Sequence, residues 1–288
     1  MVVPKVKAGF ADLPLTRLHF ATAGDGQPLI MVPATISELD SWQGLIQFMA
    51  LRFKVYFFEL PGHGQSTAFK SGFSTDQVAE TVADWTKQMG LNRFSLMGFS
   101  FGGILAIKTL ARLTAQIDRM ILLSPLVTNQ ALLFSRLRQE VLKLTGQAMQ
   151  AVAMQSLLLK TAHNQRLVNL LIKLLTRLGH VETGGPRLAG LHAKLLRLPA
   201  ATLDVLVNEI KEILNFNPQM PPFPQPCSFA MSINDPLLDF TTTENWLKAH
   251  FPRLSTQKFT FPYHQPPQPL RFDELVAQYQ PFLDLIHD

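Results

Sequence analysis

The segment from Phe94 to Arg112 constrains the fold of this chain more than any other. A strand-length apolar run, 94–97, leads directly into Gly98-Phe99-Ser100-Phe101-Gly102, and a helical pattern follows at 104–112. In such a G-x-S-x-G pattern the serine stands on a sharp, strained strand-to-helix turn that exposes its hydroxyl above a sheet. The helix N-terminus also directs positive dipole and free N–H groups toward that serine. We therefore predict that Ser100 is a nucleophile.

Apolar strands and amphipathic helices alternate on both sides of this turn. The expected strands lie at 28–32, 54–60, 94–97, 119–123, 228–233 and 257–261. The expected helices lie at 41–52, 74–89, 104–112 and 272–286. This alternation predicts an α/β fold with a mostly parallel central sheet covered by helices on both faces. Apolar runs at 10–13 and 15–21 predict an antiparallel hairpin at the sheet edge.

The pattern changes after Pro125. From 129 to 215 the chain shows Leu-rich helical periodicity and no strand signal. A proline-rich stretch, 218–226, then indicates a rigid return to the sheet. We therefore expect a core domain formed by 1–125 and 221–288, interrupted by an all-helical cap at 126–220.

Composition excludes several classes of protein. The 288 residues are 47% hydrophobic and 16% charged, which argues against disorder. The net charge is +5, and basic residues gather at 126–220. Such a segment can meet a membrane surface, nucleic acid or anionic substrates, but we expect a solvated polar face. No stretch concentrates basic and aromatic residues together, so no nucleic-acid partner is expected. No apolar run reaches the roughly 18 residues of a membrane span. The first residues lack the apolar region of a secretory signal, which predicts a cytoplasmic protein. The sequence carries no signal for an oligomeric state.

Several motifs along the chain resemble those of the α/β-hydrolase superfamily, in particular its capped serine hydrolases of the esterase and lipase type. The turn 61–66 is similar to their P-G-x-G-x-S motif, and 39–42 is similar to the segment that enters their first helix. The stretch 233–238 resembles the one that carries their catalytic acid, and Tyr263-His264 follows the last strand, where their catalytic histidine stands.

The resemblance implies a catalytic triad of Ser100, Asp235 and His264, in the family's order of nucleophile, acid and base. His264 would accept the serine proton and return it to the leaving group, and Asp235 would hold the imidazole in the required tautomer. Asp239 is the closest rival for the acid. The chain has seven other histidines, of which His63 belongs to the 61–66 turn.

The resemblance also implies an oxyanion hole of two backbone N–H groups. Phe101, the residue after the nucleophile, would supply one. Relatives supply the other from a loop that often begins His-Gly, whereas this chain has Pro33-Ala34-Thr35-Ile36. Because proline has no N–H, we expect the second donor to be Thr35, with Ala34 as the alternative.

No cofactor or metal is expected. The chain has no H-E-x-x-H motif, no Cys/His cluster and no G-x-G-x-x-G fingerprint. Its one cysteine, Cys227, lies in an apolar run and is expected to be a buried core residue.

The predicted function is cleavage of a small-to-medium, largely apolar carboxylic ester through an acyl-enzyme. Similar folds with a serine nucleophile also cleave carbon–carbon bonds, hydrolyse thioesters or lactones, or transfer acyl groups, and these alternatives stay open. A serine in the strand-to-helix turn argues against dehalogenases and epoxide hydrolases, which use a carboxylate as the nucleophile. A catalytically silent binding module with the same fold is the alternative of another class.

Overall fold

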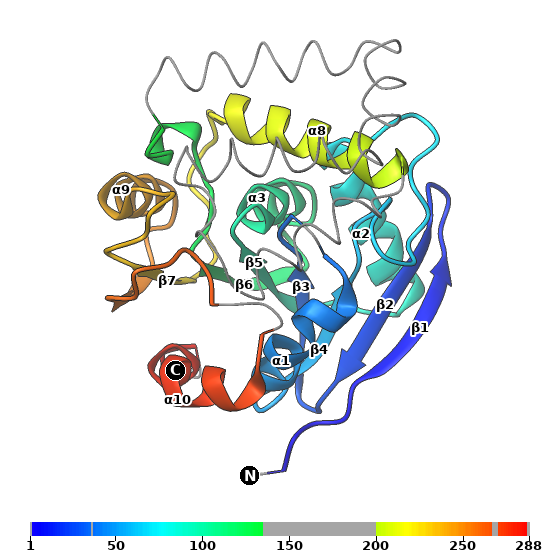
Figure 1. Cartoon of the computed structure of the whole chain (residues 1–288), viewed down its shortest axis with the longest axis horizontal. Coiled ribbons are helices and arrows are strands. Elements are labelled where there is room, and N and C mark those ends of the chain that lie inside the picture. Colours follow the sequence, from blue (N-terminus) through cyan, green and yellow to red (C-terminus); the bar gives the residue numbers. More distant parts are fainter. Residues whose placement is uncertain (1, 36, 135–199, 267–269, 287–288) are drawn as a thin grey trace, which may run out of the picture.

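The computed structural model describes residues 2–35, 37–134, 200–266 and 270–286, which build an eight-stranded sheet with helices on both faces (Figure 1). The strands are β1 (Lys7–Asp12), β2 (Arg17–Ala23), β3 (Gln27–Val32), β4 (Phe53–Phe58), β5 (Phe94–Phe99), β6 (Ile117–Leu123), β7 (Cys227–Ser232) and β8 (Leu254–Phe259). Their order in the sheet is β1-β2-β4-β3-β5-β6-β7-β8. The predicted α/β fold is confirmed.

Only the first two strands run against the others. β1 pairs with β2 and β2 with β4 in antiparallel register, and the five pairs from β4–β3 to β7–β8 are parallel. The predicted antiparallel hairpin at the edge is therefore confirmed. The central strand β5 is buried along its whole length, which explains why it is a continuous apolar run instead of an alternating one.

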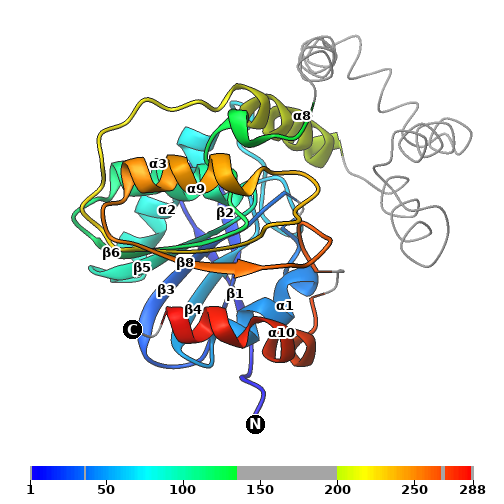
Figure 2. The same ribbon diagram turned by 90° about the vertical axis from the view of Figure 1, so that its left-hand side faces the viewer.

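The helices form a layer on each face of the sheet (Figure 2). On one face lie α1 (Leu39–Met49) and α10 (Phe272–Leu285), which pack against each other. On the other lie α2 (Thr75–Gln88), α3 (Gly102–Arg112) and α9 (Phe240–His250). Each layer covers its own apolar core, one centred on Trp85 and Phe229 and the other on Trp42 and Phe282. The chain thus buries its apolar side chains in two layers, as doubly wound sheets do.

The parallel strands β3 to β8 all end at the same edge of the sheet. The loops that follow them at this edge contain 33–38, 59–66, 100–101, 124–128, 233–239 and 260–266. In open α/β sheets this carboxyl edge is where ligands bind. Every residue predicted for the active site lies in these loops.

The predicted cap lies mostly outside the described residues, which omit 135–199. Its described parts include the short 3-10 helix η1 (Asn129–Ala131) and α8 (Ala200–Asn215). Asn129 donates a hydrogen bond to the carbonyl of Leu214, and Thr202 donates one to the carbonyl of Gly62 in the 61–66 turn. α8 therefore rests on the carboxyl edge of the sheet, and the boundaries 126–220 stay a prediction.

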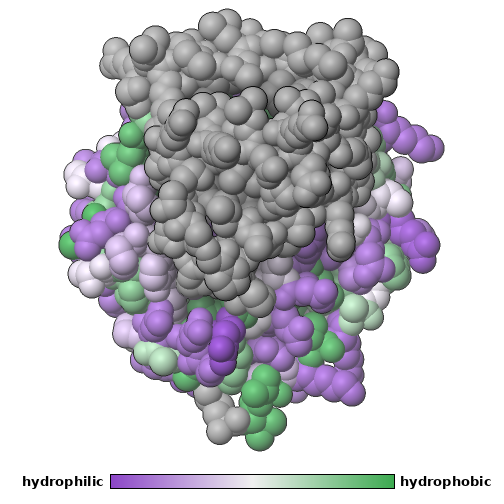
Figure 3. Space-filling model, viewed as in Figure 1, coloured by the Kyte–Doolittle hydropathy of each residue, from purple (hydrophilic) through white to green (hydrophobic). Residues whose placement is uncertain are grey.

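The surface of the described residues is mixed in character. On the face that Figure 3 shows, hydrophilic side chains predominate and the visible apolar ones lie in small groups among them. Among the large apolar residues that the structure describes, Val2 and Leu133 are the most exposed.

Candidate active site

The turn between β5 and α3 holds Ser100 in a backbone conformation that side chains rarely adopt. Its φ is 54°, in the left-handed region, which costs a non-glycine residue roughly 1 kcal/mol or more. A Cβ on Gly102 would lie 2.6 Å from the carbonyl oxygen of Val32 and 2.8 Å from that of Pro33. Glycine at this position therefore lets the turn pack directly against the loop that follows β3.

A chain of two hydrogen bonds joins Ser100 to His264 and His264 to Asp235. The distance from Ser100 Oγ to His264 Nε2 is 2.8 Å, and that from His264 Nδ1 to Asp235 Oδ2 is 2.7 Å. The Asp235 side chain is fully buried and that of His264 nearly so. A carboxylate can only accept, so it orients the imidazole with its proton on Nδ1 and leaves Nε2 free to accept the serine proton.

The acid is itself held by the backbone. Asp235 Oδ1 accepts hydrogen bonds from the N–H of Leu237 at 2.8 Å and of Leu238 at 3.0 Å. Two further bonds tie the loop after β7 to the loop that carries His264. Ser232 Oγ donates to the carbonyl of Phe261 at 2.5 Å, and Asn234 Nδ2 donates to that of Thr260 at 3.1 Å. The acid and the base are therefore positioned together.

The rival residues have other partners. Asp239 caps α9, because its Oδ1 accepts from the N–H of Thr242 at 2.7 Å. Among the described histidines, His19 contacts Glu59, His63 contacts the N–H of Ser37, and His250 contacts the carbonyl of Trp246. His163, His180, His192 and His287 lie outside the described residues. The structure thus brings Asp235 and His264, and not Asp239, to Ser100.

The predicted oxyanion donors lie on the two loops that meet at Gly102. Within the described part of the chain, the backbone N–H groups of Phe101 and Thr35 donate no hydrogen bond. Phe101 immediately precedes α3, where helical N–H groups lack intrahelical acceptors. Two unpaired N–H groups from these two loops are what an oxyanion hole requires, and their role stays a prediction.

The described residues contain no group of three or more His, Cys, Asp or Glu side chains that could hold a metal ion. Likewise, none of the described helices is long and apolar enough to span a membrane. Cys227 is buried in β7, as predicted, and burial raises the pKa of its thiol. A thiol held neutral in this way is a poor nucleophile.

Glu59 is a buried carboxyl group at the same edge of the sheet and is absent from the residues predicted for the site. The sequence feature that could have identified it is its position, since Glu59 is an acid at the end of an apolar strand, just before the 61–66 turn. A carboxylate that is buried with its strand must find hydrogen-bond donors nearby.

Comparison with known proteins identifies the fold family of the chain. A family model described as alpha/beta hydrolase fold matches residues 27–209, which include Ser100 and end before Asp235 and His264. A pimeloyl-[acyl-carrier protein] methyl ester esterase of Nitrosomonas europaea is 28% identical over 110 residues, which are 38% of this chain and 42% of that protein. The chain spans less than half the length of the curated relatives it matches.

Solved structures resemble the chain over nearly its whole length. An esterase of Thermogutta terrifontis aligns with a TM-score of 0.68 at 16% identity, covering 98% of this chain and 100% of that one. An enol-lactonase of Burkholderia xenovorans aligns with a TM-score of 0.67 at 14% identity, covering 97% and 100%. At such low identity the likeness shows the fold alone.

Proposed function

Because the chain belongs to the alpha/beta hydrolase fold family, we propose that it is a serine hydrolase that cleaves a small-to-medium, largely apolar carboxylic ester through an acyl-enzyme. The observation that carries the proposal is the hydrogen-bonded chain Ser100–His264–Asp235, with distances of 2.8 and 2.7 Å. Such a chain activates a serine hydroxyl, which is otherwise a poor nucleophile at neutral pH. The esterase among the curated relatives supports an ester as the substrate class.

In the proposed reaction, Ser100 Oγ attacks the ester carbonyl while its proton passes to His264 Nε2. The N–H groups of Phe101 and Thr35 stabilise the negative oxygen that develops. The intermediate then expels the alcohol, which takes the proton from Nε2. A water molecule next gives a proton to Nε2 and attacks the acyl group. Ser100 leaves with that proton, and the carboxylic acid is released.

A fluorophosphonate probe tests the nucleophile. Wild type is expected to be labelled at Ser100, and Ser100→Ala is expected to lose the label. Ser124→Ala is the matched control, because Ser124 also has a positive φ, of 42°, and lies at the end of the neighbouring strand. It should be labelled like wild type. An unlabelled wild type would support the catalytically silent binding module instead, and equal labelling of Ser100→Ala would show that Ser100 is not the residue that reacts.

A series of p-nitrophenyl esters from acetate to dodecanoate tests the substrate class. Turnover of the apolar members by wild type, and a drop of at least about 1000-fold in kcat for His264→Ala, are expected. If Ser100 is labelled but the whole series is left intact, the ester proposal is wrong. Carbon–carbon cleavage, thioester or lactone hydrolysis, or acyl transfer would then use the same three residues.

A further inference from the structure

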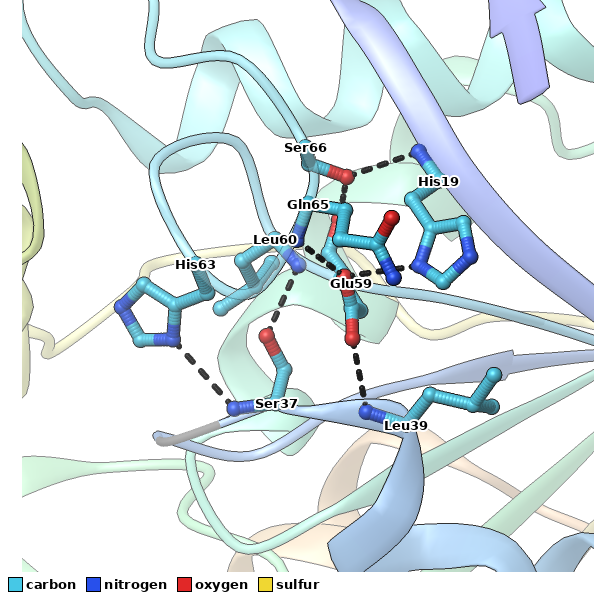
Figure 4. Close-up of polar contacts among 8 residues, drawn as sticks. All are labelled: His19, Ser37, Leu39, Glu59, Leu60, His63, Gln65 and Ser66. Carbon is cyan, nitrogen blue, oxygen red and sulfur yellow. Dashed lines mark hydrogen bonds and ion pairs between the residues drawn. The ribbon is translucent and has the colours of Figure 1, made fainter.

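The carboxylate of Glu59 is buried and surrounded by donors from three segments (Figure 4). Its Oε1 accepts from the N–H of Leu39 at 2.7 Å. Its Oε2 accepts from the N–H of Gln65 at 2.6 Å and lies 2.9 Å from Nδ1 of His19. Hydrogen bonds to an ionised acceptor are roughly twice as strong as neutral ones. Glu59 therefore fastens these segments together.

One of the fastened segments is the loop that carries Thr35. Leu39 is the first residue of α1, where backbone N–H groups lack intrahelical acceptors and the helix dipole favours a negative charge. The N-cap residue, Glu38, makes no side-chain capping bond. Glu59 supplies an acceptor at that helix end from the neighbouring strand, and so holds the point where the loop enters α1.

Two further bonds hold the same loop closer to Thr35. Ser37 donates its N–H to His63 Nδ1 at 3.3 Å, and its Oγ accepts from the N–H of Leu60 at 2.8 Å. Both partners belong to the segment that begins at Glu59, as Figure 4 shows. Ser37 stands only two residues after Thr35. Leu60 and His63 therefore hold this loop at Ser37, close in sequence to Thr35.

We propose that Glu59 is a positioning residue that holds the loop of Thr35 in place to complete the oxyanion hole. This inference rests on the function proposed above. It requires a carboxylate and not merely a polar side chain of the same size. A glutamine has one acceptor oxygen and one NH₂ donor, so in either orientation it would set an N–H group against the N–H of Leu39 or of Gln65.

The test compares Glu59→Gln with Ser66→Ala. Ser66 belongs to the same turn, where its Oγ accepts from His19 N–H at 2.9 Å and donates to the Glu59 carbonyl at 2.8 Å. It makes no hydrogen bond to the described residues of the 33–39 loop. Glu59→Gln is expected to lower kcat about 10- to 100-fold with little change in KM, because a displaced donor is lost mainly in the transition state. Ser66→Ala should lower the melting temperature and leave kcat within about twofold of wild type.

The kinetics are measured well below both melting temperatures, with circular dichroism to verify folding. If Glu59→Gln has the kcat of wild type, or if Ser66→Ala loses as much, the inference is wrong. Fluorophosphonate labelling distinguishes a failure of the Glu59 inference from a failure of the proposed function. In Glu59→Gln the label should still appear only at Ser100, more slowly, whereas an unlabelled wild type would refute the function itself.

Ser37→Ala gives a second test that leaves the carboxylate in place. It removes the acceptor for the Leu60 N–H and so loosens the same loop. A drop of about threefold or more in kcat is expected, with KM little changed. An unchanged kcat in this variant would overturn the inference, including the case where Glu59→Gln does not fold.

Discussion

Glu209 is a buried carboxyl group, and neither of its oxygens has a hydrogen-bond partner among the residues that the structure describes. His63 lies beside it, with Nε2 3.8 Å from Oε1, which is too far for a hydrogen bond. Burial raises the pKa of Glu209 well above its usual value and lowers the pKa of His63 to about 4. Both shifts favour the uncharged forms, so we regard this contact as one between two neutral groups and not as an ion pair.

A stability measurement tests this. A group whose pKa is raised by folding contributes stability at low pH and loses it as the pH rises toward the folded-state pKa. The side chain of Glu209→Gln stays neutral at every pH. The free energy of unfolding of this variant, measured relative to that of wild type, should therefore be higher at pH 8 than at pH 5. The linkage slope for one proton is at most about 1.4 kcal/mol per pH unit. Urea unfolding at both pH values measures the difference.

Glu212→Gln is the control, because Glu212 lies on the same helix, is part-exposed, and is 4.0 Å from Lys108. Its difference from wild type should stay nearly constant between the two pH values. A Glu209→Gln variant that behaves in the same way would show that Glu209 is ionised in the folded protein.

At the scale of an element, two neighbouring acids have different tasks. Asp239 is the N-cap of α9, whereas Asp235 contacts His264. Asp239→Ala should therefore lower the free energy of unfolding by about 1 kcal/mol, the usual value of an N-cap, and keep most of the kcat expected under the proposed function. Asp235→Asn should fold but lose about 1000-fold or more in kcat. Thermal unfolding and ester kinetics of both variants measure this.

Ser74→Ala provides a second capping variant far from the acid, since Ser74 Oγ accepts from the N–H of Gln77 at the start of α2. It should cost a similar amount of stability at unchanged kcat. A loss of activity in Asp239→Ala that exceeds the loss in Ser74→Ala, with Asp235→Asn still active, would exchange the roles of the two acids.

The elements with strong apolar patterns could be predicted from the sequence, and those with weak patterns could not. The apolar run 94–97 predicts β5, which lies at Phe94–Phe99. The prediction is close because every residue of the strand is buried and its sequence is therefore apolar. β8 was expected at 257–261 but lies at Leu254–Phe259. Only its last residue is fully buried, so its sequence carries little alternation to read. The sequence of α9 does not indicate a helix, since its first turn contains three β-branched threonines.

The residues of the candidate site also differ in how well the sequence predicts them. Ser100, Asp235 and His264 were predictable because each follows a strand in a recognisable motif. Glu59 was not, because its importance depends on donors from Leu39 and Gln65 that only the folded chain brings to it. The acceptor contact of His63 with Ser37 likewise depends on how two separate loops meet.

At the scale of the whole molecule, the strand order could not be predicted from local patterns. β3 lies between β4 and β5, and β6 pairs with β7 although about one hundred residues separate Met120 from its partner Cys227. Closing a loop of that length costs about 4 kcal/mol of chain entropy before any contact compensates for it. Contacts so distant in sequence form slowly.

We therefore expect β7 and β8 to join the sheet after β3, β5 and β6 have paired. Hydrogen exchange pulsed during refolding should protect the amides of Leu96 and Ile121 before those of Phe229. Proline isomerisation also slows refolding, so the experiment is repeated with a prolyl isomerase, which should leave the order unchanged. Simultaneous protection of all three amides would refute this order.

Because β7 is expected to pair with β6 late, the parts of the site are expected to form at different times during refolding. Ser100 follows β5, in the half of the sheet expected to form early, whereas Asp235 and His264 follow β7 and β8. During refolding the nucleophile would stand on a nearly complete support before its base arrives. Fluorophosphonate reactivity should then recover later than the burial of Trp42 and Trp85, so the reaction itself reports the last step of folding.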